Sequence, residues 1–124
     1  MRYLLDTHTL LWARGTPDLL SADALAVLKA PDNALYISIA SLWECAIKSC
    51  IGKLDVPDDF YRIVSSDYEV LGVDVTHVEL CASLPMHHRD PFDRMLVAQA
   101  RLAGLTLVTR DRNLARYGVP IVVA

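Results

Sequence analysis

The chain has 124 residues, of which 53% are hydrophobic and 22% charged, and its formal net charge is −3. This composition excludes disordered, collagen-like and fibrous proteins, and the length predicts a single domain spanning residues 1–124. The charge is uneven, because residues 87–124 carry +3 and residues 1–86 carry −6. A basic face that contacts phosphate is therefore compatible with the acidic total, and a solvated arginine-rich surface is the alternative.

Cysteine usage and hydropathy indicate the compartment. Cys45, Cys50 and Cys81 include no C-x-x-C pair and are typical of reduced thiols. The chain has no signal-peptide pattern at its start and no apolar run of about 18 residues, so we expect a cytoplasmic protein that does not span a membrane. The mean hydropathy of +0.29 suggests an apolar surface that a partner covers.

Apolar runs and helix-boundary residues alternate along the chain. The elements predicted in chain order are a strand at Tyr3–Leu5, helices at Thr7–Arg14 and Ser21–Lys29, a strand at Leu35–Ser38, helices at Ser41–Ile51 and Pro57–Ser65, a strand at Tyr68–Val73, helices at Thr76–Leu84 and Pro91–Ala103, a strand at Leu105–Thr109, a helix at Asn113–Tyr117 and a strand at Ile121–Val123. This alternation predicts an α/β fold with a parallel sheet covered by helices on both faces.

Four acids follow predicted strands. Asp6 and Asp111 come just after strands, and Glu44 and Asp93 lie in the first turns of helices. Because the carboxyl ends of parallel strands share one edge of a sheet, we expect the four carboxylates to meet there. Their mutual repulsion would require a divalent cation, and an all-oxygen site favours Mg²⁺ or Mn²⁺ over zinc. Such a site suits phosphodiester hydrolysis.

Most of these acids also have a plain structural interpretation. Asp90 is a good N-cap for the helix that begins at Pro91, and Asp93 then lies at its third position, where a carboxylate is favourable. Ser41-x-x-Glu44 has the pattern of a capping box, and Asp111 fits as the cap of the last helix. Only Asp6 lacks such an explanation, because a charge that ends an apolar strand is costly without a partner.

Four ordered blocks carry a family resemblance: Leu5-Asp6-Thr7-His8, Ser38-x-x-Ser41-x-Trp43-Glu44, Asp90-Pro91-Phe92-Asp93-Arg94 and Val108-Thr109-Arg110-Asp111. Together they resemble the signature blocks of the PIN-domain ribonucleases over nearly the whole chain. More narrowly, the sequence resembles the VapC-type toxins of bacterial toxin–antitoxin pairs, in the subgroup with H-R-D-P-F-D-R.

The resemblance implies a Rossmann-like three-layer α/β/α fold, with a five-stranded parallel sheet in the order 3-2-1-4-5. It implies that Mg²⁺ or Mn²⁺ activates water for RNA cleavage in a four-carboxylate pocket. Asp6 and Asp93 would be the principal metal ligands, and Glu44 and Asp111 would complete the metal site, directly or through water. Supporting roles, by hydrogen bonds to the ligands, would fall to Thr7, Thr9, Ser41 and Thr109. Asp90 is the extra acid of the subgroup, with no assigned role.

Cationic and imidazole groups near the acids are further candidates. Arg94, Arg110 and Arg112 flank the acids and could contact RNA phosphates. His8 is a weak candidate for a general base. The pair His87-His88, with Cys81, fits no standard zinc spacing, and a loop before a helix explains it better.

The implied partners are RNA, a cognate antitoxin that wraps the toxin, and a second copy of the chain. An apolar groove near Leu10, Leu11 and Trp12 is the expected antitoxin site. The alternative function is a catalytically silent PIN-fold interaction module. A receiver-type signalling domain is less favoured, because Asp6 has no acidic neighbour and no lysine follows Lys53. A haloacid-dehalogenase-type phosphatase would need Asp-x-Asp where the chain has Asp6-Thr7-His8.

Overall fold

Helices and strands alternate through the computed structural model, which describes residues 1–124. In chain order they are β1 (Arg2–Leu5), α1 (Thr7–Gly15), η1 (Pro17–Leu19), α2 (Ala22–Lys29), β2 (Ala34–Ser38), α3 (Ile39–Cys50), α4 (Phe60–Asp67), β3 (Glu69–Leu71), α5 (Val75–Ser83), α6 (Pro91–Ala103), β4 (Thr106–Thr109), η2 (Arg112–Tyr117) and β5 (Ile121–Val123), where η denotes a 3₁₀ helix. All five strands and all seven helices of the sequence-based prediction are present, and only η1 was not predicted.

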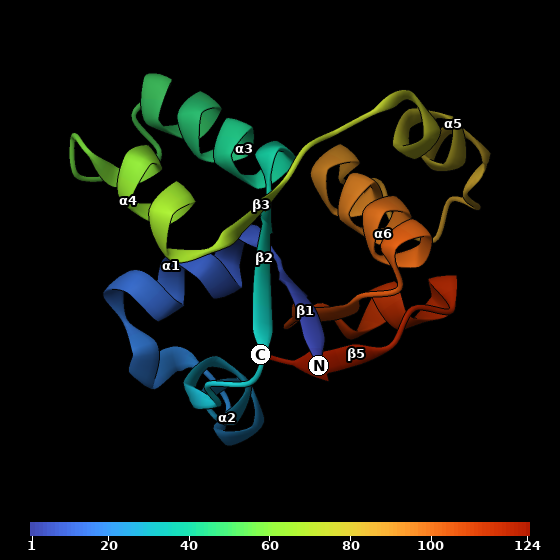
Figure 1. The fold of residues 1–124 in the computed structure, drawn as a ribbon. Helices are drawn as coiled ribbons and strands as arrows, with labels where there is room; N and C mark the ends of the chain where they lie inside the picture. Colours follow the sequence, from blue (N-terminus) through green and yellow to red (C-terminus); the bar gives the residue numbers. More distant parts are fainter.

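The five strands form one parallel sheet in the order β3-β2-β1-β4-β5, which confirms the fold that the resemblance implied (Figure 1). β1 is central, with Leu5 level with Ile37 on one side and with Val108 on the other. The carboxyl ends of β1, β2 and β4 therefore lie next to one another. Residues that follow these strands are brought together although they are far apart in the sequence.

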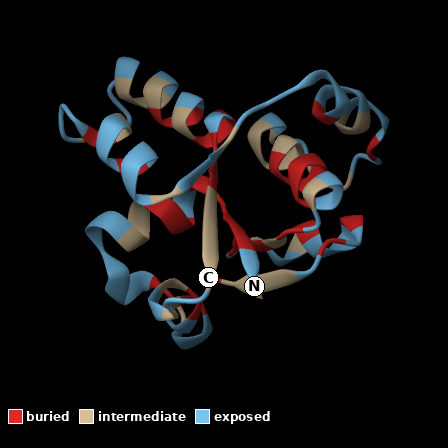
Figure 2. Cartoon of the chain, viewed as in Figure 1, coloured by how far each residue is buried: buried red, intermediate tan, exposed pale blue.

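Alternate strand residues face opposite sides of the sheet and build two cores. Tyr3 and Leu5 belong to a buried cluster with α1, α2, α3 and α4, whereas Leu4 and Leu107 belong to a second cluster with α6 and η2. Figures 1 and 2 show α1 to α4 on one side of the sheet and α5 and α6 on the other, with the buried residues along the strands and the inner helix faces. Both faces of the central strand are thus sealed from water.

The start of α3 differs from the prediction, and the interpretation of Ser41 as its cap is wrong. The N-cap is Ser38, the last residue of β2, whose Oγ accepts a hydrogen bond from the Ala40 amide at 3.0 Å. The helix therefore begins at Ile39 with no loop after the strand. Ser41 lies in the first turn, fully buried, and its Oγ has no hydrogen-bond partner.

The start of α6 agrees with the prediction. Asp90 is the N-cap, Pro91 is the first residue, and Gly104 ends the helix in the left-handed conformation with φ 67°. The sharp start matters for function, because it fixes where the side chain of Asp93 points. None of the helices combines the length and the apolar character that crossing a membrane requires.

Candidate active site

Asp6 joins the central strand to α1. Its amide continues the β1–β4 pairing by donating to the Val108 carbonyl at 3.1 Å, and its Oδ1 accepts from the Thr9 amide at 2.8 Å. The Thr9 hydroxyl donates to the same Val108 carbonyl at 3.0 Å. Asp6 is therefore an N-cap, a structural role that the sequence analysis did not assign to it. Its carboxylate is only slightly exposed and lies at the carboxyl edge of the sheet.

Glu44 is a buried carboxylate with both oxygens engaged. Oε1 accepts from the Thr7 hydroxyl at 2.5 Å, and Oε2 forms an ion pair with Lys48 at 2.9 Å, one helical turn further along α3. The hydrogen bond to Glu44 raises the pKa of the Lys48 ammonium. Lys48, which the sequence analysis did not consider, therefore compensates the Glu44 charge. The i, i+4 spacing was the signal for this pair.

The first turn of α6 places Asp93 among other acids. Asp90 Oδ1 accepts from the amides of Phe92 at 2.9 Å and Asp93 at 3.1 Å, so Asp90 serves as the cap. Burial raises the pKa of the Asp93 carboxyl to about 7, and the negative charges of Asp90, Asp6 and Glu44 add to the rise, whereas His88 opposes it. The acids from β1, α3 and α6 are therefore close enough to repel one another.

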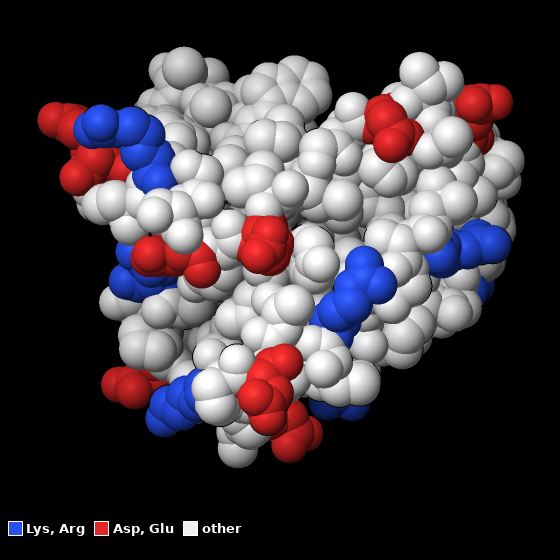
Figure 3. All heavy atoms as spheres, in the orientation of Figure 1, with Lys and Arg blue, Asp and Glu red and all other residues white.

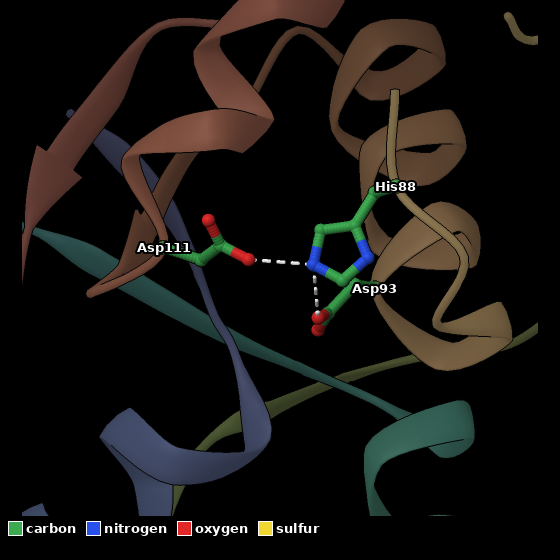
Figure 4. A group of neighbouring side chains, drawn as sticks. All are labelled: His88, Asp93 and Asp111. Carbon is green, nitrogen blue, oxygen red and sulfur yellow. Dashed lines mark hydrogen bonds and ion pairs between the residues drawn. The ribbon is translucent and has the colours of Figure 1, made fainter. Parts of the chain in front are cut away.

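Asp111 approaches the same place from the end of β4. Its amide donates to Thr109 Oγ1 at 3.1 Å, and its Oδ1 caps η2 by accepting from the Asn113 amide at 3.0 Å. The other oxygen, Oδ2, lies 2.5 Å from His88 Nε2, which is also 3.3 Å from Asp93 Oδ2 (Figure 4). His88 thus bridges the two acids, a position that the sequence analysis gave to no residue.

A pocket with a volume of about 370 Å³ opens beside these groups. Three aspartates line the pocket together with two histidines, a tryptophan and an arginine. The lining residues are Asp6, His8, Trp12, His88, Asp93, Arg110 and Asp111. Glu44 and Asp90 are not among the lining residues, although their charges act on Asp93. The sheet edge therefore carries an open pocket that is lined by Asp6, Asp93 and Asp111, but not by Glu44.

The three candidate arginines have different surroundings. Arg94 donates to the carbonyls of Cys81, Leu84, Pro85 and His88 and to the Tyr117 hydroxyl, at 2.9 to 3.4 Å. Its guanidinium holds the segment before α6, so we no longer expect it to contact phosphate. Arg110 donates to the Leu19 and Ala124 carbonyls, with its guanidinium 4.1 Å from the centre of the Trp12 ring. Arg112 is exposed, and no hydrogen bond or ion pair engages its side chain.

The histidines differ in how close they lie to the acidic residues. His88 forms a possible metal-binding group with Asp93 and Asp111, in which the ligand atoms lie within 4.8 Å of one another. His87 and Cys81 are not part of this group, and the His87 ring instead lies 5.0 Å from that of Tyr117. His8 lines the pocket and is exposed. The signal for His88 was its place two residues before the cap of α6 in H-R-D-P-F-D-R.

The site residues fit a hard divalent cation. Asp6, Asp93 and Asp111 present carboxylate oxygens, and burial, followed by the charges of Asp90, Asp6 and Glu44, raises the pKa of Asp93. A bound cation would relieve that repulsion, and Mg²⁺ and Mn²⁺ prefer such oxygen ligands. The one nearby imidazole does not make this a typical zinc site, which needs a set of cysteine or histidine ligands.

Comparison with protein families agrees with this geometry, since the model of the PIN domain matches residues 3–120. The chain belongs to the PIN domain family. Among solved structures, this PIN domain is similar to VapBC2 from Rickettsia felis bound to a DNA fragment from their promoter, with 18% identity over 99% of this chain and 98% of that one and a TM-score of 0.76.

Two further structures are similar to this PIN domain. A toxin–antitoxin complex from Klebsiella pneumoniae has 22% identity, covering 98% of this chain and 96% of that one, with a TM-score of 0.68. DNA-bound VapBC from Salmonella typhimurium has 21% identity, covering 99% of this chain and 98% of that one, with a TM-score of 0.70. At these identities the similarity establishes the fold. No curated protein gave a significant match to the sequence.

Proposed function

We propose that this PIN domain is a Mg²⁺- or Mn²⁺-dependent endoribonuclease that acts as the VapC-type toxin of a toxin–antitoxin pair. The observation that carries the proposal is the convergence of Asp6, Glu44, Asp93 and Asp111 at the carboxyl edge of the sheet, where the negative charges of Asp6 and Glu44 help raise the pKa of Asp93. The similarity to solved toxin–antitoxin complexes supports the toxin assignment.

The site residues would have different roles in this reaction. Asp6, Asp93 and Asp111 would hold the cation, which when bound would activate water and neutralise charge on the scissile phosphate. Glu44 is hydrogen-bonded to Thr7 and paired with Lys48, so it makes only the smallest of the charge contributions that raise the pKa of Asp93. Arg110 is pre-positioned by two carbonyls and the Trp12 ring at the pocket, where its guanidinium could contact an RNA phosphate. Arg112, exposed nearby, is the second phosphate candidate.

The test is cleavage of labelled total RNA by the purified, partner-free protein with Mg²⁺, Mn²⁺ or EDTA. We expect cleavage that requires metal and falls about 10²–10³-fold in Asp93→Asn, because the variant loses a charged ligand worth several kcal/mol in the transition state. Asp58→Asn is the matched control, since Asp58 is exposed and outside the pocket.

Each outcome of this assay has a consequence. Cleavage that persists in EDTA, or in Asp93→Asn at the wild-type rate, contradicts the proposed site. A folded protein that neither cleaves RNA nor binds metal would instead favour the catalytically silent interaction module. Cleavage at specific positions would lead to the natural RNA.

The proposal includes two protein partners. The antitoxin groove was expected near Leu10, Leu11 and Trp12, but Leu10 is fully buried in the core and cannot line a groove. Leu11 does line one of about 260 Å³, and we place the antitoxin there. That groove runs between α1 and the segment leading into α4, with these lining residues: Leu11, Arg14, Gly15, Asp55, Val56, Pro57, Phe60 and Ile63.

A second copy of the chain would cover the larger apolar groove between α3 and α6. This groove has a volume of about 490 Å³ and includes Trp43, whose side chain is 62% exposed, next to Phe92. Figure 3 shows this part of the surface without charged side chains, whereas acidic and basic groups are scattered elsewhere on the same face. Burial of so much apolar surface is favourable, so a homodimer is expected.

The expected result is a mass of two chains by light scattering for the wild type and of one chain for Trp43→Glu. A buried, unpaired carboxylate at this interface would cost several kcal/mol. Leu19→Glu, at an exposed position outside the groove, should leave the dimer intact. A wild-type mass of a single chain at working concentration would contradict the proposed dimer.

A further inference from the structure

His88 is held in place from three sides. Its amide donates to the Tyr117 hydroxyl at 2.9 Å, its carbonyl accepts from Arg94 at 3.4 Å, and its ring Nδ1 accepts from the Asp90 amide at 3.1 Å. These contacts leave Nε2 directed at Asp111 and Asp93, as Figure 4 shows. The first two contacts fix the main chain of His88, and the contact at Nδ1 fixes the orientation of its ring.

The contact at Nδ1 determines which ring nitrogen carries the proton. A backbone amide can only donate, so Nδ1 must accept with its lone pair and carries no hydrogen. The proton of a neutral imidazole then lies on Nε2, which donates to Asp111 Oδ2 at 2.5 Å. A proton on Nδ1 would instead point at the Asp90 amide hydrogen.

A histidine that binds a metal ion through Nε2 carries its proton on Nδ1, whereas neutral His88 carries its proton on Nε2. A histidine that ligates a cation through one nitrogen normally donates a hydrogen bond from the other, to a carbonyl or a carboxylate. In His88 the nitrogen nearest the acids carries the hydrogen, and the other nitrogen accepts. Ligation through Nε2 would therefore require either an imidazolate or the loss of the Asp90 contact.

We propose that His88 is a positioning residue of the acidic site, which orients Asp111 and Asp93 by donating from Nε2, and that it is not a metal ligand. The inference rests on the proposed function, because it assigns the cation to the carboxylates alone. It also predicts a preference for hard oxygen-ligated cations over zinc, since the imidazole is not available as a nitrogen ligand.

Two substitutions of His88 distinguish the contact at Nδ1 from the contact at Nε2. In His88→Asn the side-chain oxygen lies near the position of Nδ1 and can still accept from the Asp90 amide, but nothing reaches Asp111. In His88→Gln the side-chain nitrogen lies near the position of Nε2 and can still donate to Asp111. His87→Gln is the control, because the His87 side chain is outside the acidic group.

The first measurement is the nitrogen NMR spectrum of the metal-free protein, in which protonated and unprotonated ring nitrogens have distinct shifts. We expect Nε2 protonated and Nδ1 unprotonated in His88. The second is Mn²⁺ affinity, which should fall about 10–100-fold in His88→Asn and stay close to wild type in His88→Gln and His87→Gln, as for loss of a group that orients a ligand. The third is the electron spin-echo spectrum of the Mn²⁺-loaded wild type, which should show no directly bonded nitrogen.

Three results would overturn the inference. They are a His88 nitrogen bonded to Mn²⁺, a His88 ring protonated on Nδ1 in the neutral form, and a His88→Asn variant with wild-type Mn²⁺ affinity. A wild type that binds no Mn²⁺ at all overturns the proposed function itself, and this inference with it. A metal-binding wild type with an unaffected His88→Asn variant overturns this inference alone.

Discussion

Replacement of Asp93 by asparagine is expected to make the metal-free protein more stable at pH 8. The folded state raises the pKa of this carboxyl from 3.8 to about 7, chiefly through burial and then through the charges of Asp90 and Asp6. The folded state therefore prefers the protonated form, and the free energy of unfolding falls as pH rises from about 4 to about 7. Asparagine does not titrate and avoids this loss.

The size of the effect follows from the same pKa. At ~1.36 kcal/mol per pKa unit the upper limit is about 4 kcal/mol, and solvent screening of a partly exposed carboxyl reduces it to the order of 1–2 kcal/mol. Urea unfolding in EDTA at several pH values measures it. The difference between Asp93→Asn and wild type should shrink toward pH 4. Asp58→Asn, at an exposed position outside the pocket, is the control.

Metal should reverse this order of stability. A cation that binds only the folded wild type stabilises it by mass action, whereas the variant lacks one charged ligand and gains less. Urea unfolding repeated at pH 8 with Mn²⁺ should therefore bring the wild type level with the variant or above it. A wild type that is already the more stable protein at pH 8 in EDTA would contradict the pKa argument.

Arg94→Ala is expected to destabilise the protein by about 2–3 kcal/mol, the range for loss of hydrogen bonds to a charged group. The guanidinium donates to four main-chain carbonyls and a hydroxyl, which tie the end of α5 and the following segment to α6 and η2. Arg94→Lys should recover little of the loss, because an ammonium cannot reach the same spread of acceptors.

Arg112→Gln is the contrasting variant. Arg112 is exposed, so its replacement should leave the unfolding free energy within about 0.5 kcal/mol of wild type. If Arg112 contacts an RNA phosphate, the slope of log affinity against log salt should become shallower by about 1. Arg94→Ala, measured where it is folded, should keep the wild-type slope. Equal stability of the two variants would contradict the structural role of Arg94.

The fold could be predicted because its determinants are local in the sequence. The cap, the proline and the glycine of α6 lie within or beside the helix, and each predicted strand is a short apolar run. The start of α3 was missed because Ser38 both ends β2 and caps the helix, so no turn residue marks the boundary. The pattern Ser41-x-x-Glu44 then suggested a later start.

The site was predictable only in part. Acids that follow parallel strands must meet, and Asp6, Asp93 and Asp111 do line one pocket. The contacts that arrange them join distant residues: Thr7 to Glu44, His88 to Asp111, and Arg94 to the carbonyl of Cys81. No local spacing encodes such pairs. Arg94 illustrates the difficulty, because flanking an acid in sequence says nothing about the carbonyls that its side chain reaches.

Because several of the acids cap helices, their presence alone does not indicate a metal site. Asp6, Asp90 and Asp111 each use one oxygen to begin a helix, and the buried Glu44 is joined to the half-buried Lys48 in an ion pair. Replacing any of these four residues would therefore remove a structural contact as well as a negative charge. Asp93 is different, because its charge opposes folding in the metal-free protein and no capping bond of its own explains it. A substitution at Asp93 therefore tests the site more cleanly than a substitution at any of the other four acids, because it removes no capping bond.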